Sequence, residues 1–233
     1  MELQIRGLRK VFGGGKVALD GIDLQFTAGV TGLVGPNGSG KTTLLRLLAT
    51  TLAPNAGQIV WNGIDAAKHP DALRRDLLYV PQNFAGYPSF SAQEFLEYLA
   101  RLRGVASAAA RKAATDALEV VGLGDDRKRR LGAFTPGMMQ RLSIAYALQT
   151  DAKVVLLDEP TAGLDPGARR LFSNAIRKTA GERITILCTH ILEDLEALAD
   201  RIVALRAGKV AEEVSRDELR RVYADVFELE MAS

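Results

Sequence analysis

The sequence has 233 residues, of which 47% are hydrophobic, and its 30 basic and 28 acidic side chains leave a formal net charge of +2. A chain of this length can bury a substantial core, as one large domain or as a domain with an inserted lobe. Because the charges nearly cancel, the composition argues against a nucleic-acid binder that relies on bulk positive charge.

Cysteine content and hydrophobic run length predict where the chain resides. Cys188 is the only cysteine, so an intrachain disulfide is impossible and a reducing compartment is expected. The first residues contain no apolar segment typical of a secretory signal. The longest apolar runs, such as 154–157, are far shorter than the roughly 20 residues that cross a bilayer. We therefore expect a soluble chain whose membrane role, if any, comes through a partner.

The first part of the chain predicts β-strands. Apolar and polar residues alternate in two runs that glycines end, one with Leu3, Ile5 and Leu8 and one with Ile22, Leu24 and Phe26. A short strand at 30–34 then leads into a glycine-rich loop and a leucine-rich helix at 42–50. Residues 58–61 predict another short strand.

From about residue 84 the pattern becomes helical. Ser91 and Glu94 form a capping box, an alanine-rich helix is expected at 107–121, and a third helix at 137–149. Strands and helices alternate again beyond residue 152, with strands at 154–157, 184–188 and 202–205 and helices near 167–179 and 192–199. The last ten or so residues are charged and show no pattern that predicts an element.

This order of elements predicts an α/β fold with a mostly parallel sheet and helices on its faces. The helical block interrupts the alternation, so we interpret 84–150 as an inserted lobe. The expected organisation is one domain over 1–233, in which 1–83 and 151–233 form the β-rich part.

A phosphate-binding loop is predicted between the strand at 30–34 and the following helix. The pattern G-x-x-x-x-G-K-[ST] is matched, and Thr43 follows it, so the candidate residues are Gly35, Pro36, Asn37, Gly38, Ser39, Gly40, Lys41, Thr42 and Thr43. Backbone N–H groups and the helix start would surround phosphate oxygens, Lys41 would reach the β- and γ-phosphates, and Thr42 would bind Mg²⁺. A chance match in a glycine-rich turn arises in roughly one chain of this length per hundred.

Two acids follow the buried run at 154–157. Asp158 ends a predicted parallel strand, where open α/β sheets bind ligands, and is well placed to hold Mg²⁺ directly or through water. Glu159 faces elsewhere and can polarise an attacking water. The alternative is an Asp-Glu turn capped by Pro160.

Over nearly the whole chain these motifs, in this order, resemble the ATP-binding-cassette (ABC) family. The resemblance implies a P-loop NTPase of the RecA-like kind, with an N-terminal antiparallel β subdomain and an inserted α-helical subdomain. It implies adenine stacking on Phe12, whose alternative role is hairpin packing. It also implies that Gln82 reaches Mg²⁺ and the attacking water, that Asp165 meets the opposite subunit, and that His190 contacts the γ-phosphate. A histidine after a strand is otherwise usually structural.

The signature motif departs from the family pattern LSGGQ. This chain has Phe134-Thr135-Pro136-Gly137-Met138. Thr135 can serve as the N-cap, Pro136 is tolerated at the first helical position, and the N–H groups of Gly137 and Met138 should point toward an anion. We interpret the motif as altered but competent; the alternative is a helix that no longer grips ATP, with slow hydrolysis.

The family resemblance also implies partners. Two subunits, expected to be a homodimer, would enclose two ATP molecules and act on a transmembrane permease at the inner face of the cell membrane. Phe84, Tyr87 and Phe90 would receive that partner, unless they are core residues. No nucleic-acid partner is expected, because 125–130 mixes acids with its basic residues.

The motif pattern is closest to the ATPases of bacterial ABC-2-type exporters, although importers share most motifs. A soluble ABC-type ATPase that regulates a ribosome or a DNA-repair complex is the alternative. A small-molecule kinase leaves Gln82, the signature helix and His190 unexplained together.

Overall fold

The computed structural model describes the backbone of residues 1–231 and the side chains of residues 1–225. The chain forms two compact units, one with residues 1–79, 152–159 and 179–233 and the other with residues 80–151 and 160–178. The block 84–150, expected as an inserted lobe, lies entirely in the second unit, which also takes in 160–178. No helix in the described part of the chain is both long and apolar enough to cross a membrane.

Two sheets organise the first unit. An antiparallel sheet in the order β2-β1-β4-β5 contains β1 (Leu3–Val11), β2 (Val17–Phe26), β4 (Ala56–Trp61) and β5 (Ile64–Asp65). A six-stranded sheet in the order β10-β9-β3-β8-β7-β6 contains β3 (Gly29–Val34), β6 (Leu77–Val80), β7 (Val154–Asp158), β8 (Ile184–Cys188), β9 (Arg201–Arg206) and β10 (Lys209–Ser215). Strands β9, β3, β8 and β7 are parallel, and β10 is antiparallel at the edge. The mostly parallel α/β sheet is as the sequence predicted.

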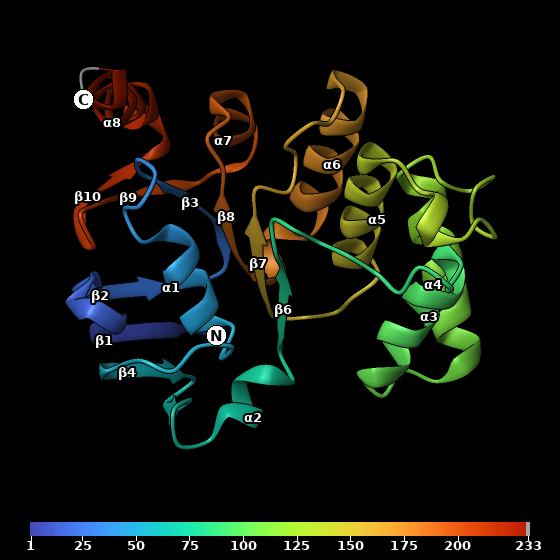
Figure 1. Ribbon diagram of the computed structural model, residues 1–233, viewed down its shortest axis with the longest axis horizontal. Helices are drawn as coiled ribbons and strands as arrows, with labels where there is room; N and C mark the ends of the chain where they lie inside the picture. Colours follow the sequence, from blue (N-terminus) through green and yellow to red (C-terminus); the bar gives the residue numbers. More distant parts are fainter. Residues whose placement is uncertain (232–233) are drawn as a thin grey trace. The chain divides into compact units, whose positions relative to one another are not determined.

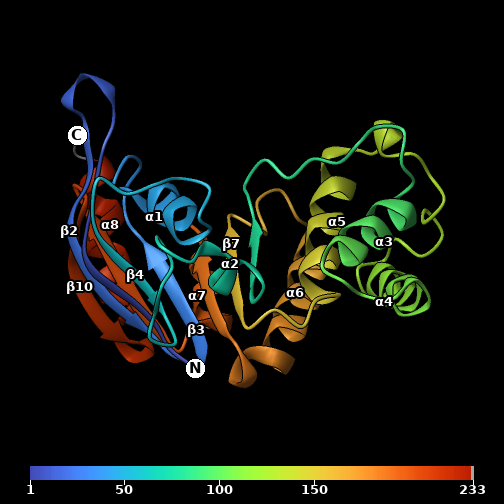
Figure 2. The ribbon, with the colours of Figure 1, turned by 90° about the horizontal axis from the view of Figure 1, so that it is seen from below.

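Helices cover both faces of the parallel sheet. The helices of this unit are α1 (Lys41–Leu48), α2 (Pro70–Arg74), α7 (Leu192–Leu198) and α8 (Leu219–Met231). Helix α1 lies between the two sheets and buries four leucines, whereas α7 and α8 lie on the other face (Figures 1 and 2). Successive side chains of β9 point to opposite faces of the sheet. Val203 packs into the core around α1, and Ile202 packs against α7 and α8.

Four helices make up most of the second unit, α3 (Ala92–Leu102), α4 (Ser107–Val120), α5 (Pro136–Leu148) and α6 (Pro166–Thr179). Helices α3, α4 and α5 pack side by side (Figure 2). The predicted capping box is confirmed, since Ser91 Oγ accepts from the N–H of Glu94 and the Glu94 carboxylate accepts from the N–H of Ser91.

The sequence predicted no element for the last ten or so residues, whereas the structure has helix α8 over Leu219–Met231. Leu219 and Val222 are buried at helical spacing, which is too short an apolar pattern to stand out among charged residues. The charged residues are paired across the surface instead, with Arg221 Nη2 2.7 Å from Glu212 Oε1 on β10. Packing against α7 and β9 therefore stabilises a helix that local sequence does not reveal.

Candidate functional site

The glycine-rich loop between β3 and α1 has a backbone that only small residues permit. A Cβ on Gly35 would lie 2.3 Å from the carbonyl oxygen of Leu205. Gly40, the residue before α1, has φ 107° and would bring a Cβ to 2.6 Å from the carbonyl oxygen of Ala18. These close approaches explain why glycine is needed at both ends of the loop.

Lys41 and Thr42 begin α1 directly after the loop. The ammonium group of Lys41 donates to the carbonyl oxygens of Gly35, at 2.6 Å, and Pro36, at 3.1 Å, so its positive charge lies at the loop itself. Ser39 is buried, and its hydroxyl has no hydrogen-bond partner within the described residues. The loop thus combines a cation, a helix start and an unsatisfied buried hydroxyl, which is chemistry suited to an anion.

Asp158 ends β7 and is 2% exposed. Its Oδ1 lies 3.5 Å from the Thr42 hydroxyl, and its Oδ2 lies 3.4 Å from the Tyr79 hydroxyl. Burial raises the pKa of the Asp158 carboxyl, while hydrogen bonds from Cys188, Thr42 and Tyr79 act in the opposite direction. The carboxylate is therefore costly to hold here unless a cation or a proton accompanies it.

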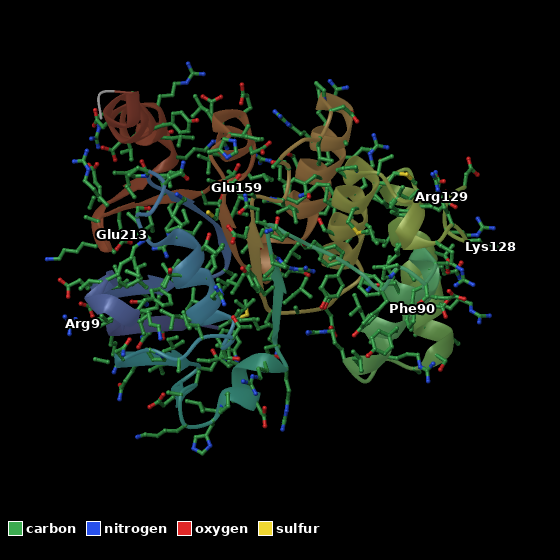
Figure 3. All side chains as sticks on the ribbon, in the orientation of Figure 1. Arg9, Phe90, Lys128, Arg129, Glu159 and Glu213 are labelled. Carbon is green, nitrogen blue, oxygen red and sulfur yellow. The ribbon has the colours of Figure 1, made fainter. Side chains whose placement is uncertain are left out.

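Glu159 and His190 come together at the same edge of the sheet. Nδ1 of His190 lies 2.8 Å from Oε2 of Glu159, and the two side chains are 61% and 11% exposed. Glu159 has a left-handed backbone with φ 52°, and its N–H donates to the carbonyl oxygen of Cys188 at 2.8 Å. Such a conformation is strained for a non-glycine residue. Glu159 is labelled in Figure 3, at the end of β7.

The remaining candidates lie in the second unit, except Phe12. Thr135 is the N-cap of α5 and Pro136 its first residue, as predicted. The N–H of Met138, which was expected to point toward an anion, donates to Thr135 Oγ1 at 3.3 Å as part of the cap. Gln82 is exposed and follows β6, and Phe12 is 38% exposed.

Asp165 precedes α6, and its carboxylate accepts several hydrogen bonds. Its carboxylate accepts from the N–H of Ala168 at 2.9 Å and from Arg141 of the signature helix at 2.6 Å. These two hydrogen bonds, led by that from Ala168, lower the pKa of Asp165. The loop that carries Asp165 is thereby tied to α5 within the second unit.

Sequence reasoning did not identify Tyr79, Cys188 or Arg141 as part of the site. Tyr79 and Cys188 contact Asp158 because β6 and β8 flank β7 in the sheet. Their positions follow from strand order, and no local motif marks them. Arg141 carries a weak signal, since it lies on the helix of the signature motif.

Taken together, the first unit brings the loop, Asp158, Glu159 and His190 to the carboxyl ends of parallel strands β3, β7 and β8. A glycine-rich loop between strand and helix, with a following lysine and hydroxyl and a nearby strand-end acid, defines a nucleotide-phosphate site of the P-loop class.

Comparisons with known proteins agree with this class. The profile of the family described as "ABC transporter" matches residues 19–162. The doxorubicin resistance ATP-binding protein DrrA of Mycobacterium tuberculosis is 37% identical over 230 residues, which cover 97% of this chain and 70% of DrrA. The ABC transporter ATP-binding protein NatA of Bacillus subtilis is 35% identical over 196 residues, covering 83% of this chain and 78% of NatA.

Solved structures share the fold. An ATP-binding subunit of an ABC transporter superposes with a TM-score of 0.88 at 24% identity, covering all of both chains. A bacterial Atm1-family ABC exporter with ATP bound gives a TM-score of 0.85 at 25% identity, covering all of this chain and 42% of the exporter chain. The chain belongs to the ABC transporter family, and within it to the ATP-binding subunits, which are ATPases.

We expect Asp158→Asn to raise the thermal unfolding midpoint of the chain without metal or nucleotide by a few degrees at pH 7. Burial raises the pKa of this carboxyl, so the folded state binds the proton more tightly than the unfolded chain. Stability is therefore lost as the pH rises from the ordinary value of 3.8 through the folded pKa, and the neutral amide removes that loss.

Thermal melts between pH 3 and pH 8 measure this difference. The gain should vanish at the acidic end, where the wild-type carboxyl is protonated in both states. The exposed Asp71, exchanged for asparagine, is the control and should change nothing. A lower midpoint for Asp158→Asn throughout the range would contradict the burial argument.

Proposed function

We propose that this chain is the ATP-driven subunit of an exporter, in which two copies close around ATP and move a separate transmembrane subunit. The observation that carries the proposal is the convergence of the phosphate loop, Asp158, and the Glu159–His190 pair at one sheet edge. Export is favoured because DrrA, similar over 97% of this chain, is described as a doxorubicin resistance protein.

ATP binds first to the loop in this proposal. Backbone N–H groups of Gly38 to Thr42 donate to phosphate oxygens, and the Lys41 ammonium reaches the β- and γ-phosphates. A phosphate oxygen would also supply the acceptor that the buried Ser39 hydroxyl lacks. The face of the Phe12 ring stacks on adenine. Nζ of Lys10, on β1, lies 5.4 Å from the centroid of that ring.

Thr42 and Asp158 would hold Mg²⁺, and Gln82 would complete the set. Oxygen ligands suit this ion, which usually takes few protein ligands and fills its other positions with phosphate oxygens and water. The described residues fit that pattern, because the Thr42 hydroxyl and the Asp158 carboxylate present two oxygen atoms 3.5 Å apart at the end of the phosphate loop. The ion, when bound, would neutralise charge that develops on the transferred phosphoryl group.

Hydrolysis depends on Glu159 and His190. The Glu159 carboxylate accepts a hydrogen bond from the attacking water and orients its lone pair toward the γ-phosphorus. His190 contacts the γ-phosphate, and its proximity to Glu159, at 2.8 Å, keeps both groups on one side of the reacting phosphate. Lys41 and the loop N–H groups offset negative charge on the departing ADP.

A second copy of the chain completes each site. Thr135 and Gly137, at the start of α5, would grip the γ-phosphate of ATP held by the opposite loop, and Asp165 would meet the opposite subunit. Because the cap uses the N–H of Met138, we propose that Gly137 supplies the backbone donor nearest the anion. One chain thus holds halves of two sites, and we propose a homodimer.

Aromatic residues of the second unit supply a surface for the transmembrane partner. Tyr87 is 56% exposed and packs against Phe90 and Tyr98, with ring centroids 5.4 and 6.3 Å away. Phe90 is labelled in Figure 3, together with Lys128 and Arg129 of the same unit. Amphipathic aromatic rings of this kind are common interface anchors, so we propose that they attach the chain to its permease at the inner membrane face.

We expect Pro136→Gly to change the ATPase rate by less than about tenfold. Proline occupies the first helical position, where an N–H lacks an intrahelical partner in any case, and the Thr135 cap does not depend on it. Phosphate release at saturating ATP measures the rate, and Thr135→Ser, which keeps the capping hydroxyl, is the matched control. A larger gain would mean that the native motif lacks a donor that hydrolysis requires.

We expect a tagged Glu159→Gln chain, held with ATP, to recover a membrane protein with several spans from detergent-solubilised native membranes. The amide keeps the shape of the side chain but cannot polarise water, so ATP-bound dimers should accumulate. Mass spectrometry identifies the captured protein, and the Lys41→Ala/Glu159→Gln chain, which should not hold ATP, is the control. Recovery of ribosomes or soluble complexes alone would overturn the transporter proposal.

A further inference from the structure

Helix α8 contacts the segment that carries His190. The Tyr223 hydroxyl donates to the backbone carbonyl oxygen of His190 at 2.5 Å. The Tyr223 ring packs, with Leu192 and Val214, against the buried cluster that includes Leu219 and Val222 of α8. A phenol on the C-terminal helix is thus fixed by packing at the base of the functional histidine.

Further contacts hold α8 to α7, which begins shortly after His190. Arg220 Nε lies 2.6 Å from Glu196 Oε1, and Arg216, in the 3-10 turn just before α8, donates to the Glu196 backbone carbonyl. Within the segment that carries His190, the N–H of Ile191 donates to the Thr189 hydroxyl at 3.1 Å. The peptide group between His190 and Ile191 is therefore restrained from both ends, and its carbonyl is the end that Tyr223 restrains.

The orientation of His190 depends on this backbone. Its side chain is 61% exposed, so packing contributes little to holding the ring beside Glu159. A displacement of the backbone at 190–191 would carry Cα of His190 with it and shift the imidazole relative to the Glu159 carboxylate. A hydrogen bond from α8 to the carbonyl oxygen of His190 opposes that displacement directly.

We propose that Tyr223 is a positioning residue for hydrolysis, acting through the backbone of His190. The proposal rests on the role proposed above for His190 itself. It also assigns a task to α8, which lies beyond the residues 19–162 that match the family profile. Helix α8 would then set the geometry of a site whose phosphate loop and acids lie upstream, at 35–43 and 158–159.

The test removes the hydroxyl and keeps the ring. Tyr223→Phe preserves the packing of the ring against the buried cluster of α7, α8 and β9 but cannot donate to His190. We expect kcat to fall about three- to tenfold, the range for losing one hydrogen bond, with KM for ATP within about twofold of wild type. Hydrogen exchange of the peptide covering 188–192 should become faster, while that of the α1 peptide 41–48 should not change.

Tyr146→Phe is the matched control, because it removes another partly buried phenol hydroxyl, on α5, that has no hydrogen-bond partner among the described residues. It should leave kcat and exchange at 188–192 unchanged.

A second variant, His190→Ala, tests the role of the histidine separately from the positioning role of Tyr223. Wild-type turnover in His190→Ala would refute the proposed role of the histidine, whatever Tyr223→Phe does.

The outcome that overturns the inference is different. If His190→Ala is slow but Tyr223→Phe matches wild type in kcat and in exchange at 188–192, Tyr223 has no positioning role. The double variant gives a second, independent reading. If Tyr223 acts through His190, Tyr223→Phe should lower kcat no further once His190 is alanine. If the two substitutions lower kcat independently, so that their effects add in full, the inference is also overturned.

Discussion

The register of the parallel sheet is the constraint on which the rest of the site depends. Cys188 on β8 pairs with Leu33 on β3 and with Asp158 on β7, so these three strands end at the same level. The phosphate loop, the two acids and His190 each follow one of those ends. A slip of one residue in any strand would point alternate side chains to the opposite face and separate the groups. The buried aliphatic residues of β7 and β8 fix that register through packing.

Function at this edge opposes stability. Asp158 is a buried carboxylate with its pKa raised by desolvation, and Glu159 holds a left-handed backbone that β-strand residues avoid. Neither feature benefits the fold alone. Both make sense where a cation and a phosphate arrive, since these supply the charge and the acceptors that the isolated chain lacks. Burial of the surrounding leucine, isoleucine and valine side chains stabilises the fold enough to offset the cost of these two features.

How far the sequence predicts this molecule depends on the range of the interaction. The phosphate loop, the capping box of Ser91 and the cap of Thr135 depend on residues a few positions apart, and each was predictable from spacing. Strand ends at Asp158 and Cys188 followed from apolar runs. Tyr79 contacts Asp158 through strand order, and Tyr223 contacts His190 through the docking of α8, so neither has a local signature. Helix α8 itself was missed for the same reason, because its two buried residues pack against α7 and β9, which are not adjacent to them in the sequence pattern.

The central claim is that each chain carries halves of two ATP sites, a phosphate loop for one and a signature helix for the other. Mixing two inactive variants tests it most directly. Lys41→Ala disables the loop, and Gly137→Glu disables the start of α5, where an added side chain meets no neighbouring atom. Random pairing makes half of the dimers mixed, each with one complete site, so ATPase activity should return to about a quarter of the wild-type rate. A mixture as inactive as its two components, measured beside active wild type, would contradict the claim.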